Sequence, residues 1–495
     1  MPAAHRSFDE LHVVSDIHLG GVSPFQMFDQ GPTLAAFIDH LTERGTTNLG
    51  LVLNGDIVDF LAEDPPRYLD AEGAVRKLIR IMDDQAFSPV FEALARFVAT
   101  EGRTLILVLG NHDVELALPT VRECLRERLC KNSSAARGRL ELALDGAGYA
   151  CQVGGRSILC LHGNEVDDFN MVDYRALLEL TRAQNRGQQP LPVWKPNAGT
   201  KLVIDIMNSI KRRYAFVDLL KPETRAVPAV LLALDRAQLK QLERFAGVAL
   251  RLVHDATRKS MGFLSATADA DMPKSQTDAE ALDCLLRDAN GPTHLPSTAT
   301  DVDALLDSVE DDITNDRPVL AGVDAGQKTL GVGGLAVDAL LKRDSRENLR
   351  KSLAVWLGAD TTFATDTRDG TYTKLDEAVA GSVDFLVAGH THLMRAIRRP
   401  AGGAYFNSGT WTRLIQLNDT VLADEVAFTP FFEAVREGTM RALDETPGLV
   451  LRRPSVVSIC AHVDGAVGEL ATASLQGERL ELTPVEGTRI AVVGR

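Results

Sequence analysis

The apolar run Thr104-Leu105-Ile106-Leu107-Val108-Leu109 ends abruptly at Gly110-Asn111-His112-Asp113. A run of β-branched and aliphatic residues that stops at a polar cluster predicts a buried strand ending in a loop. This loop carries an amide, an imidazole and a carboxylate, which are side chains that can bind a metal or transfer a proton. The same order, an apolar run and then a polar cluster, occurs several more times in the chain.

Four other apolar runs end in polar clusters that offer metal ligands. The clusters are Asp16-Ile17-His18, Asn54-Gly55-Asp56-Ile57-Val58-Asp59, His162-Gly163 and Gly389-His390-Thr391-His392. Because alternate residues of an extended chain share a face, Asp16 and His18 can reach one cation. Each cluster therefore extends the pattern first seen at Asn111.

Segments with helical spacing separate the strands. Residues 33–44 have this spacing, and so do residues 71–100, with an interruption near Ser88-Pro89. The order β-α-β-α-β with uninterrupted apolar strands predicts an α/β fold in which helices cover a sheet. In such a sheet ligands bind outside the carboxyl ends of the strands, so motifs far apart in sequence can meet there.

A long interval separates the last two clusters, since His390 lies 228 positions after His162 (390 − 162). Most of the interval has helical spacing, and residues 265–318 are acidic and rich in Asp, Ser, Thr and Pro, which predicts a mobile segment. Strands with the same polar clusters flank the interval, so we expect a helical insertion in one loop of a core domain. The predicted organisation is a core in two parts, 8–167 and 381–495, around an insertion at 168–380.

Composition restricts the function. The 495 residues include 68 acidic and 53 basic side chains and carry a net charge of −15, which argues against a protein that coats nucleic acid through a broad basic face. The first residues lack an apolar signal core and no apolar segment is long enough to span a bilayer, so a cytoplasmic location is expected. The six cysteines show no C-x-x-C spacing, which predicts neither a disulfide framework nor a zinc ribbon.

Eight polar residues at strand ends form the candidate site: Asp16, His18, Asp56, Asn111, His112, His162, His390 and His392. Imidazole and carboxylate donors without cysteine suit Mn, Fe, Zn or Ni. Seven of these residues can act as metal ligands, and the eighth, His112, is not needed as a ligand. If they hold two ions, one ligand must be shared, and a carboxylate with its two oxygens is the natural bridge.

The motifs D-x-H, G-D-x-x-D, G-N-H-D, H-G and G-H-T-H, in this order, resemble those of the calcineurin-like metallophosphoesterases. The resemblance covers about residues 10–165 and 380–415 and implies a β-sandwich with helices on both outer faces. It also implies two metal sites that share Asp56 as a bridge. One site would comprise Asp16, His18, Asp56 and His392, and the other Asp56, Asn111, His162 and His390.

The resemblance implies hydrolysis of a phosphoester. Two divalent cations, with manganese expected first, lower the pKa of a bridging water and orient it for in-line attack on phosphorus. His112 is predicted to be the general acid, a role worth a rate factor of about 10²–10⁴. Asp59 and Asp113 are predicted to orient His112 or a metal-bound histidine. Arg395 and Arg398, which follow the G-H-T-H motif, are candidates to grip a substrate phosphate.

The motifs leave the substrate open. A phosphodiesterase acting on a nucleotide or another small phosphodiester is favoured. A nucleotide-lipid hydrolase is the first alternative, because the position of the insertion is similar to that in the UDP-2,3-diacylglucosamine pyrophosphohydrolase branch, and a nuclease is the second. The non-enzymatic alternative is a scaffold that keeps the fold as a binding surface. In each case the insertion is a candidate contact for a protein partner or nucleic acid.

Overall fold

The computed structural model describes residues 6–235, 345–357 and 360–493, and these form two compact units. The first unit comprises Met1–Ile204, Thr361–Leu414 and Leu451–Arg495, and the second comprises Asp205–Asp360 and Ile415–Val450. These boundaries differ from the predicted 8–167, 168–380 and 381–495, because both ends of the interval pack with the core and Ile415–Val450 packs in the second unit. The acidic segment 265–318 lies outside the described residues.

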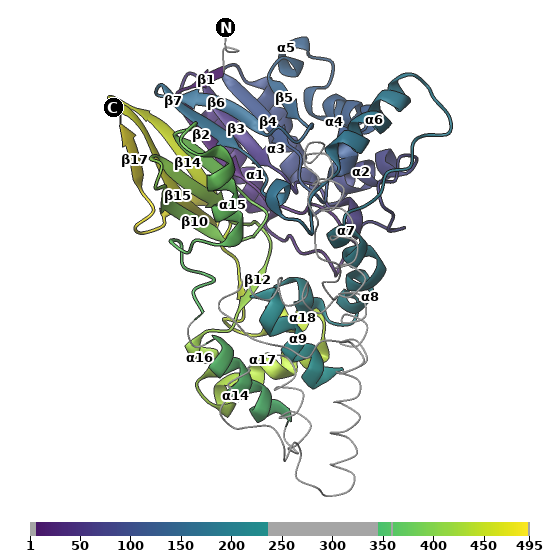
Figure 1. Ribbon diagram of the computed structural model, residues 1–495, viewed down its shortest axis with the longest axis vertical. Helices are drawn as coiled ribbons and strands as arrows, with labels where there is room; N and C mark the ends of the chain where they lie inside the picture. Colours follow the sequence, from purple (N-terminus) through teal and green to yellow (C-terminus); the bar gives the residue numbers. More distant parts are fainter. Residues whose placement is uncertain (1–5, 236–344, 358–359, 494–495) are drawn as a thin grey trace, which may run out of the picture. The chain divides into compact units, whose positions relative to one another are not determined.

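Two sheets form the centre of the first unit (Figure 1). One has the order β1-β6-β7-β9-β11-β10 and comprises Arg6–Phe8, Tyr149–Val153, Arg156–Cys160, Phe385–Ala388, Ala404–Ser408 and Met394–Arg398. The other has the order β16-β15-β14-β2-β3-β4-β5, with β17 (Ile490–Val493) beside β15. It comprises Arg479–Pro484, Gly465–Gln476, Ser455–His462, Glu10–Val14, Leu49–Asn54, Arg103–Val108 and Leu140–Ala143.

Alternation along the buried strands divides the core into layers. Val52 of β3 and Ile106 of β4 point to the core between the sheets, where they join Phe385 of β9. Their neighbours Leu51 and Leu105 point the other way and pack under helices. Because successive side chains of a strand face opposite sides, a strand buried on both faces reads as a continuous apolar run.

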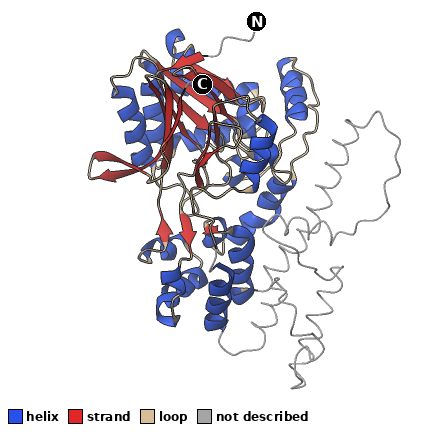
Figure 2. Cartoon of the chain, turned by 60° about the vertical axis from the view of Figure 1, so that its left-hand side comes forward, coloured by secondary structure: helices blue, strands red, loops and turns tan. Residues whose placement is uncertain are grey.

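Helices cover the outer faces of both sheets. Four helices pack over the β2-β3-β4 sheet: α1 (Gly31–Glu43), α2 (Ala74–Asp83), α3 (Ser88–Ala99) and α4 (Pro119–Cys130). On the other sheet, Tyr372 and Leu375 of α15 (Gly370–Val379) pack against Leu386 of β9. Figure 2 shows these helices beside the strands. The predicted α/β sandwich with helices on both outer faces is confirmed.

Strands from the two sides of the long interval pair directly. In β7 and β9, which run parallel, Ile158 faces Phe385 and Cys160 faces Val387. The strands that lead to His162 and His390 are therefore neighbours, and their carboxyl ends lie at the same edge of the sheet. The first unit is thus one core domain interrupted in sequence.

Two strands that are consecutive in sequence belong to different sheets. β5 pairs in parallel with β4, whereas β6 pairs with β7 in the other sheet. The loop between β5 and β6 crosses from one sheet to the other because each strand buries an apolar face of the core between the sheets.

The described part of the second unit is mainly helical. Its longer helices are α9 (Glu223–Leu234), α14 (Ser345–Leu357) and α17 (Glu425–Glu437), and α18 (Met440–Glu445) follows α17. A small sheet of order β13-β12-β8 contributes Val450–Leu451, Leu414–Gln416 and Leu220–Lys221. Among the residues described, no helix combines the length and the apolar character needed to cross a membrane.

Candidate metal centre

The carboxyl ends of the strands bring the predicted ligands together in two groups. Asp16, His18 and His392 offer ligand atoms within 4.8 Å of one another, and so do Asp56, His162 and His390. Asp16 and His18 follow β2, Asp56 follows β3, His162 follows β7, and the remaining two follow β9. The two sheets therefore deliver residues from opposite halves of the sequence to one place.

The carboxylate of Asp56 lies between the two groups. Its Oδ2 atom is 3.2 Å from His162 Nε2 and 3.8 Å from His18 Nε2. The other oxygen, Oδ1, accepts a hydrogen bond from the backbone N–H of His112 at 2.8 Å. One oxygen is thus fixed by the backbone while the other faces a histidine of each group.

The separations between the ligand atoms fit a bound cation. His18 Nε2 lies 3.2 Å from His392 Nε2, and His392 Nε2 lies 3.3 Å from Asp16 Oδ1. Donor atoms about 2.0–2.2 Å from a shared cation are separated by roughly 3–3.5 Å. A cation would satisfy the facing lone pairs of two imidazoles, which otherwise repel each other.

The hydrogen bonds of His162 and His18 leave the Nε2 atom of each ring for a metal. His162 Nδ1 donates to Asn54 O at 2.8 Å, and His18 Nδ1 donates to Asp59 Oδ2 at 3.3 Å. Such bonds fix the tautomer and direct the other nitrogen to the ion. Asn111 adds a matching signal, because its buried Oδ1 accepts no hydrogen bond within the described parts of the chain. A buried amide oxygen without a donor is costly unless a ligand satisfies it.

The backbone is strained at five of the seven predicted ligands. The φ angles of Asp16, His18, Asp56, His390 and His392 are 50°, 52°, 50°, 69° and 62°. Residues other than glycine rarely adopt this left-handed region, and such strain concentrates at functional sites. Gly110 makes the geometry possible, because a Cβ there would overlap the Oδ1 and backbone N of Asp56.

The electrostatics of the centre favour positive charge. Burial alone would raise the pKa of the Asp56 carboxyl, but His162 and His112 hold that pKa well below its usual range. Burial opposes the charge of His162, yet Asp56 keeps the pKa of its imidazole well above the usual range. Burial raises the pKa of the Asp16 carboxyl. His162 and Asp16 thus retain protons beside the ionised Asp56, and ligands that retain protons can exchange them for a cation.

His112 lies at the edge of this centre. Its Nδ1 is 3.2 Å from Asp59 Oδ1, and its ring lies 4.8 Å from that of His18. Its side chain is 18 % exposed, compared with 13 % or less for the histidines of the two groups. Burial would raise the pKa of Asp59, but His112 and His18 hold it well below the usual range, so an ionised Asp59 accepts from both rings.

Asp113 contacts no histidine in the described residues, contrary to its predicted role. Its Oδ1 accepts from Gly110 N at 2.7 Å and its Oδ2 accepts from Ile57 N at 2.8 Å. Asp113 therefore joins the loops that carry Asn111 and Asp56. Burial and the nearby Asp56 raise the pKa of its carboxyl to about 7.

Sequence reasoning missed Asp167. Its Oδ2 lies 2.8 Å from His390 Nε2 and also accepts from Asn170 Nδ2 at 2.7 Å. Burial would raise the pKa of this carboxyl, but His390 lowers it strongly. The available signal was an acidic pair, Asp167-Asp168, five residues after His162, and nothing in that spacing points to His390.

The two arginines predicted to grip substrate are Arg395 and Arg398, and the structure favours neither for this contact. Arg395 is 1 % exposed, and its guanidinium donates to Asp369 Oδ2 and to the carbonyls of Ala364 and Met394. Arg398 is exposed, but β10 runs antiparallel to β11 and pairs Arg398 with Ala404, the first residue of β11. It therefore lies at the edge of the sheet opposite His392. The prediction for Arg395 is wrong, because its guanidinium is buried and paired with Asp369. The strand that follows G-H-T-H runs away from the centre and carries Arg398 with it.

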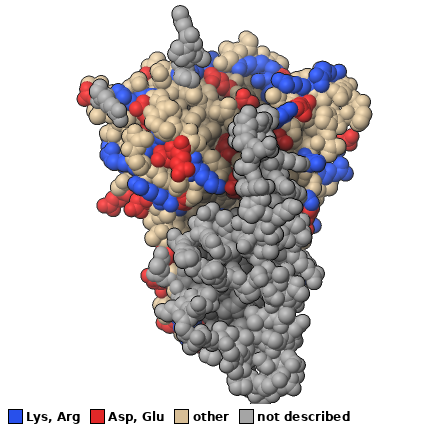
Figure 3. Space-filling model, in the orientation of Figure 1, with Lys and Arg blue, Asp and Glu red and all other residues tan. Residues whose placement is uncertain are grey.

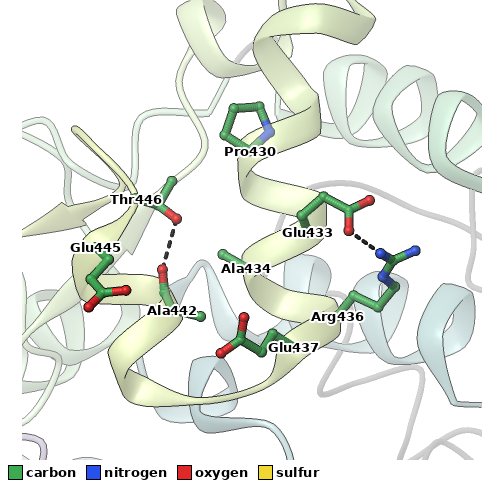
Figure 4. Close-up of a pocket in the computed structure, with 8 residues that line it drawn as sticks. All are labelled: Pro430, Glu433, Ala434, Arg436, Glu437, Ala442, Glu445 and Thr446. Carbon is green, nitrogen blue, oxygen red and sulfur yellow. Dashed lines mark hydrogen bonds and ion pairs between the residues drawn. The ribbon is translucent and has the colours of Figure 1, made fainter.

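A pocket with a volume of about 460 Å³ lies in the second unit. It is lined by residues of α17 and α18, including Glu433, Arg436, Glu437 and Glu445 (Figure 4). Glu433 pairs with Arg436, and no histidine or cysteine lines this pocket. Among the described residues, the candidate metal ligands gather at the strand ends of the first unit.

An α/β sandwich whose strand ends gather histidines and carboxylates into two adjacent groups defines a class, the α/β proteins with a candidate dinuclear metal centre. A comparison with protein families is more specific. The model of the calcineurin-like phosphoesterase family matches residues 11–213, which carry every motif except G-H-T-H. Residues 11–213 are therefore similar to the calcineurin-like phosphoesterases, and this similarity is consistent with metal-dependent hydrolysis of phosphoesters. No match was found among curated proteins.

Proposed function

We propose that this chain is a metal-dependent phosphodiesterase that acts on a nucleotide or another small phosphodiester. The observation that carries the proposal is the position of Asp56 Oδ2 between the two groups of ligands, 3.8 Å from His18 Nε2 and 3.2 Å from His162 Nε2. A carboxylate in this position can be shared by two cations. The family supports the reaction class, and the geometry supports the assignment of residues.

We assign seven ligands to two cations. Asp16, His18, Asp56 and His392 hold one, and Asp56, Asn111, His162 and His390 hold the other. When bound, two divalent cations, manganese first among them, polarise the phosphoryl group and lower the pKa of bound water. The protein holds the ligands in strained backbone conformations, so the site is preorganised before any cation arrives.

His112 is the residue that we assign to proton transfer. The ionised carboxylate of Asp59 accepts from His112 Nδ1, which orients the opposite nitrogen, Nε2, away from Asp59. In the protonated ring Nε2–H can donate to the leaving oxygen of an ester bound at the centre. The exposure of His112 fits a group that contacts substrate.

The distribution of charge supports a small substrate. On the face of the described chain seen in Figure 3, Lys and Arg side chains are interspersed with Asp and Glu. A protein that binds duplex nucleic acid by itself usually neutralises several phosphates with a basic stripe. With a net charge of −15, a small phosphodiester fits better than a long polymer.

Hydrolysis of a bis-aryl phosphate by metal-free and Mn²⁺-loaded protein tests the proposal, together with nucleotide diphosphate conjugates, cyclic nucleotides and single-stranded DNA. His112→Ala should lower kcat by about 10²–10⁴ while retaining the bound manganese. His40→Ala, an exposed histidine on α1, is the matched control and should behave as the wild type. If the wild-type protein showed no metal-dependent hydrolysis of any ester, the proposed enzymatic activity would be refuted. If His112→Ala and the wild type hydrolysed the ester at equal rates, the role of His112 as general acid would be refuted.

A further inference from the structure

A small recess in the first unit adjoins the candidate metal centre. His392 lines it together with Arg453, and Phe363, Leu414, Thr410 and Ser455 complete most of the wall. Its space is about 20 Å³, enough for one water molecule. A larger ligand must therefore lie outside the recess, against the side chains at its rim.

Arg453 is one of those side chains, and its backbone is held close to the centre. Ser455, two residues later, accepts a hydrogen bond at its carbonyl from Trp411 Nε1 at 3.0 Å. The backbone N–H of Trp411 in turn donates to Asp16 O at 3.2 Å. Two hydrogen bonds thus connect the chain at Arg453 to a predicted metal ligand, so the position of this arginine is defined by the fold.

The guanidinium of Arg453 differs from those of its neighbours. Arg452 and Arg413 both pair with Asp29, at 2.7 and 3.0 Å. Arg453 is exposed and has no hydrogen bond or ion pair with any residue in the part of the chain that the structure describes. Arg453 lines the same recess as His392, and a guanidinium without a partner in the described chain is suited to bind phosphoryl oxygens, because its N–H groups match their geometry.

The recess also has an apolar side. Phe363 is partly exposed, and Leu414 packs at the same wall. A ligand that contacts both Arg453 and Phe363 combines an anionic group with an apolar or aromatic one. An aromatic ester of a phosphodiester has this chemistry, whereas inorganic phosphate has only the anionic part.

We infer that Arg453 is a substrate-binding residue that contacts the phosphoryl oxygens of a phosphodiester at the candidate metal centre, with Phe363 against its apolar or aromatic substituent. The inference rests on the proposed function and narrows its substrate class. In this inference Arg453 takes the role that the sequence suggested for Arg395 and Arg398. Because Arg453 lies at the rim, its contribution is to binding and not to proton transfer.

Arg453→Ala and Arg452→Ala form a matched pair for the test, since the two arginines are adjacent and both are exposed. With Mn²⁺-loaded protein and bis(p-nitrophenyl) phosphate, Arg453→Ala should raise KM about tenfold with little change in kcat, and Arg453→Lys should recover part of the loss. Arg452→Ala should keep the wild-type KM. Manganese content and thermal unfolding, measured on each variant, confirm that the centre and the fold are intact.

Titration of inorganic phosphate into the Mn²⁺-loaded proteins gives a readout that does not need turnover. Affinity should fall about tenfold in Arg453→Ala and remain unchanged in Arg452→Ala. If the wild type hydrolyses the diester and both variants keep its KM and phosphate affinity, the role of Arg453 is refuted and the proposed function stands. If the wild type hydrolyses no ester, the proposed function fails, and the phosphate titration alone decides whether Arg453 binds an anion.

Discussion

His390 Nε2 and Asp167 Oδ2 lie 2.8 Å apart, although 223 positions separate the two residues in the sequence. The carboxylate accepts a hydrogen bond from Nε2–H and leaves Nδ1 of the same ring as the nitrogen with a lone pair. Asn170 Nδ2 and Phe169 N donate to the oxygens of Asp167 and hold it in place. Asp167 is therefore a positioning residue that selects the tautomer of a predicted metal ligand.

Asp167→Asn should weaken the binding of one of the two cations. Replacing the carboxylate by an amide removes the charge that orients His390, and changes of this kind typically cost 10–100-fold in metal affinity. Equilibrium dialysis with Mn²⁺ should show one affinity reduced and the other retained. Asp168→Asn is the control, because Asp168 is exposed and pairs with Lys374. Equal manganese binding by the two variants would contradict the role of Asp167.

Asp59→Asn should lower kcat through His112. The carboxylate of Asp59 accepts from the Nδ1 atoms of His112 and His18 at 3.2 and 3.3 Å, so its loss releases both rings. A reduction of about 10–100-fold is expected, with a shift of the acidic or basic limb of the pH–rate profile. In the double variant with His112→Ala the two losses should not add, since both act on one proton transfer. Additive losses would show that Asp59 affects kcat independently of His112.

Gly110→Ala should damage the centre. The new Cβ would overlap Oδ1 and the backbone N of Asp56, so the loop must shift away from the shared ligand. We expect weaker manganese binding and a loss of about 1–3 kcal/mol in the free energy of unfolding. Gly45→Ala is the control, because a Cβ at Gly45 meets no atom within 4 Å. Wild-type manganese affinity in Gly110→Ala would mean that Asp56 is not a ligand.

Glu115→Gln should change how stability depends on pH. Burial raises the pKa of the Glu115 carboxyl to about 7 in the folded protein, compared with 4.5 for the unfolded chain. Between these values the folded state binds more protons than the unfolded state, so this group makes stability fall as pH rises from about 4.5 to 7. The loss is of the order of 2–3 kcal/mol.

The glutamine stays neutral, so Glu115→Gln should be more stable than wild type at pH 8 and close to it at pH 5. Urea unfolding at both values measures the difference, and Glu72→Gln, at an exposed position, should leave the curve unchanged. A variant whose difference from wild type is the same at both pH values would contradict the buried, protonated Glu115.

The sequence alone determined the alternation of strands and helices and the positions of the metal-ligand motifs. Apolar runs such as Leu49–Leu53 have strand character whatever surrounds them, and polar residues at their ends must lie at an edge of the sheet. For the same reason the sequence placed Asp16, Asp56, Asn111 and His162 at strand ends without knowledge of their distances. Local patterns carry this information because strand periodicity and burial are local properties.

Only the tertiary structure decided which partners each residue meets. In the structure β5 and β6 lie in different sheets, and Asp113 accepts hydrogen bonds from backbone N–H groups. Asp167 lies within hydrogen-bond distance of His390. Arg395 is buried, and Arg398 lies at the end of β10 that is farther from His392. Arg453 lines the same recess as His392. Such contacts depend on strand direction and on pairing between segments hundreds of residues apart, and no local pattern of residue types records either of them.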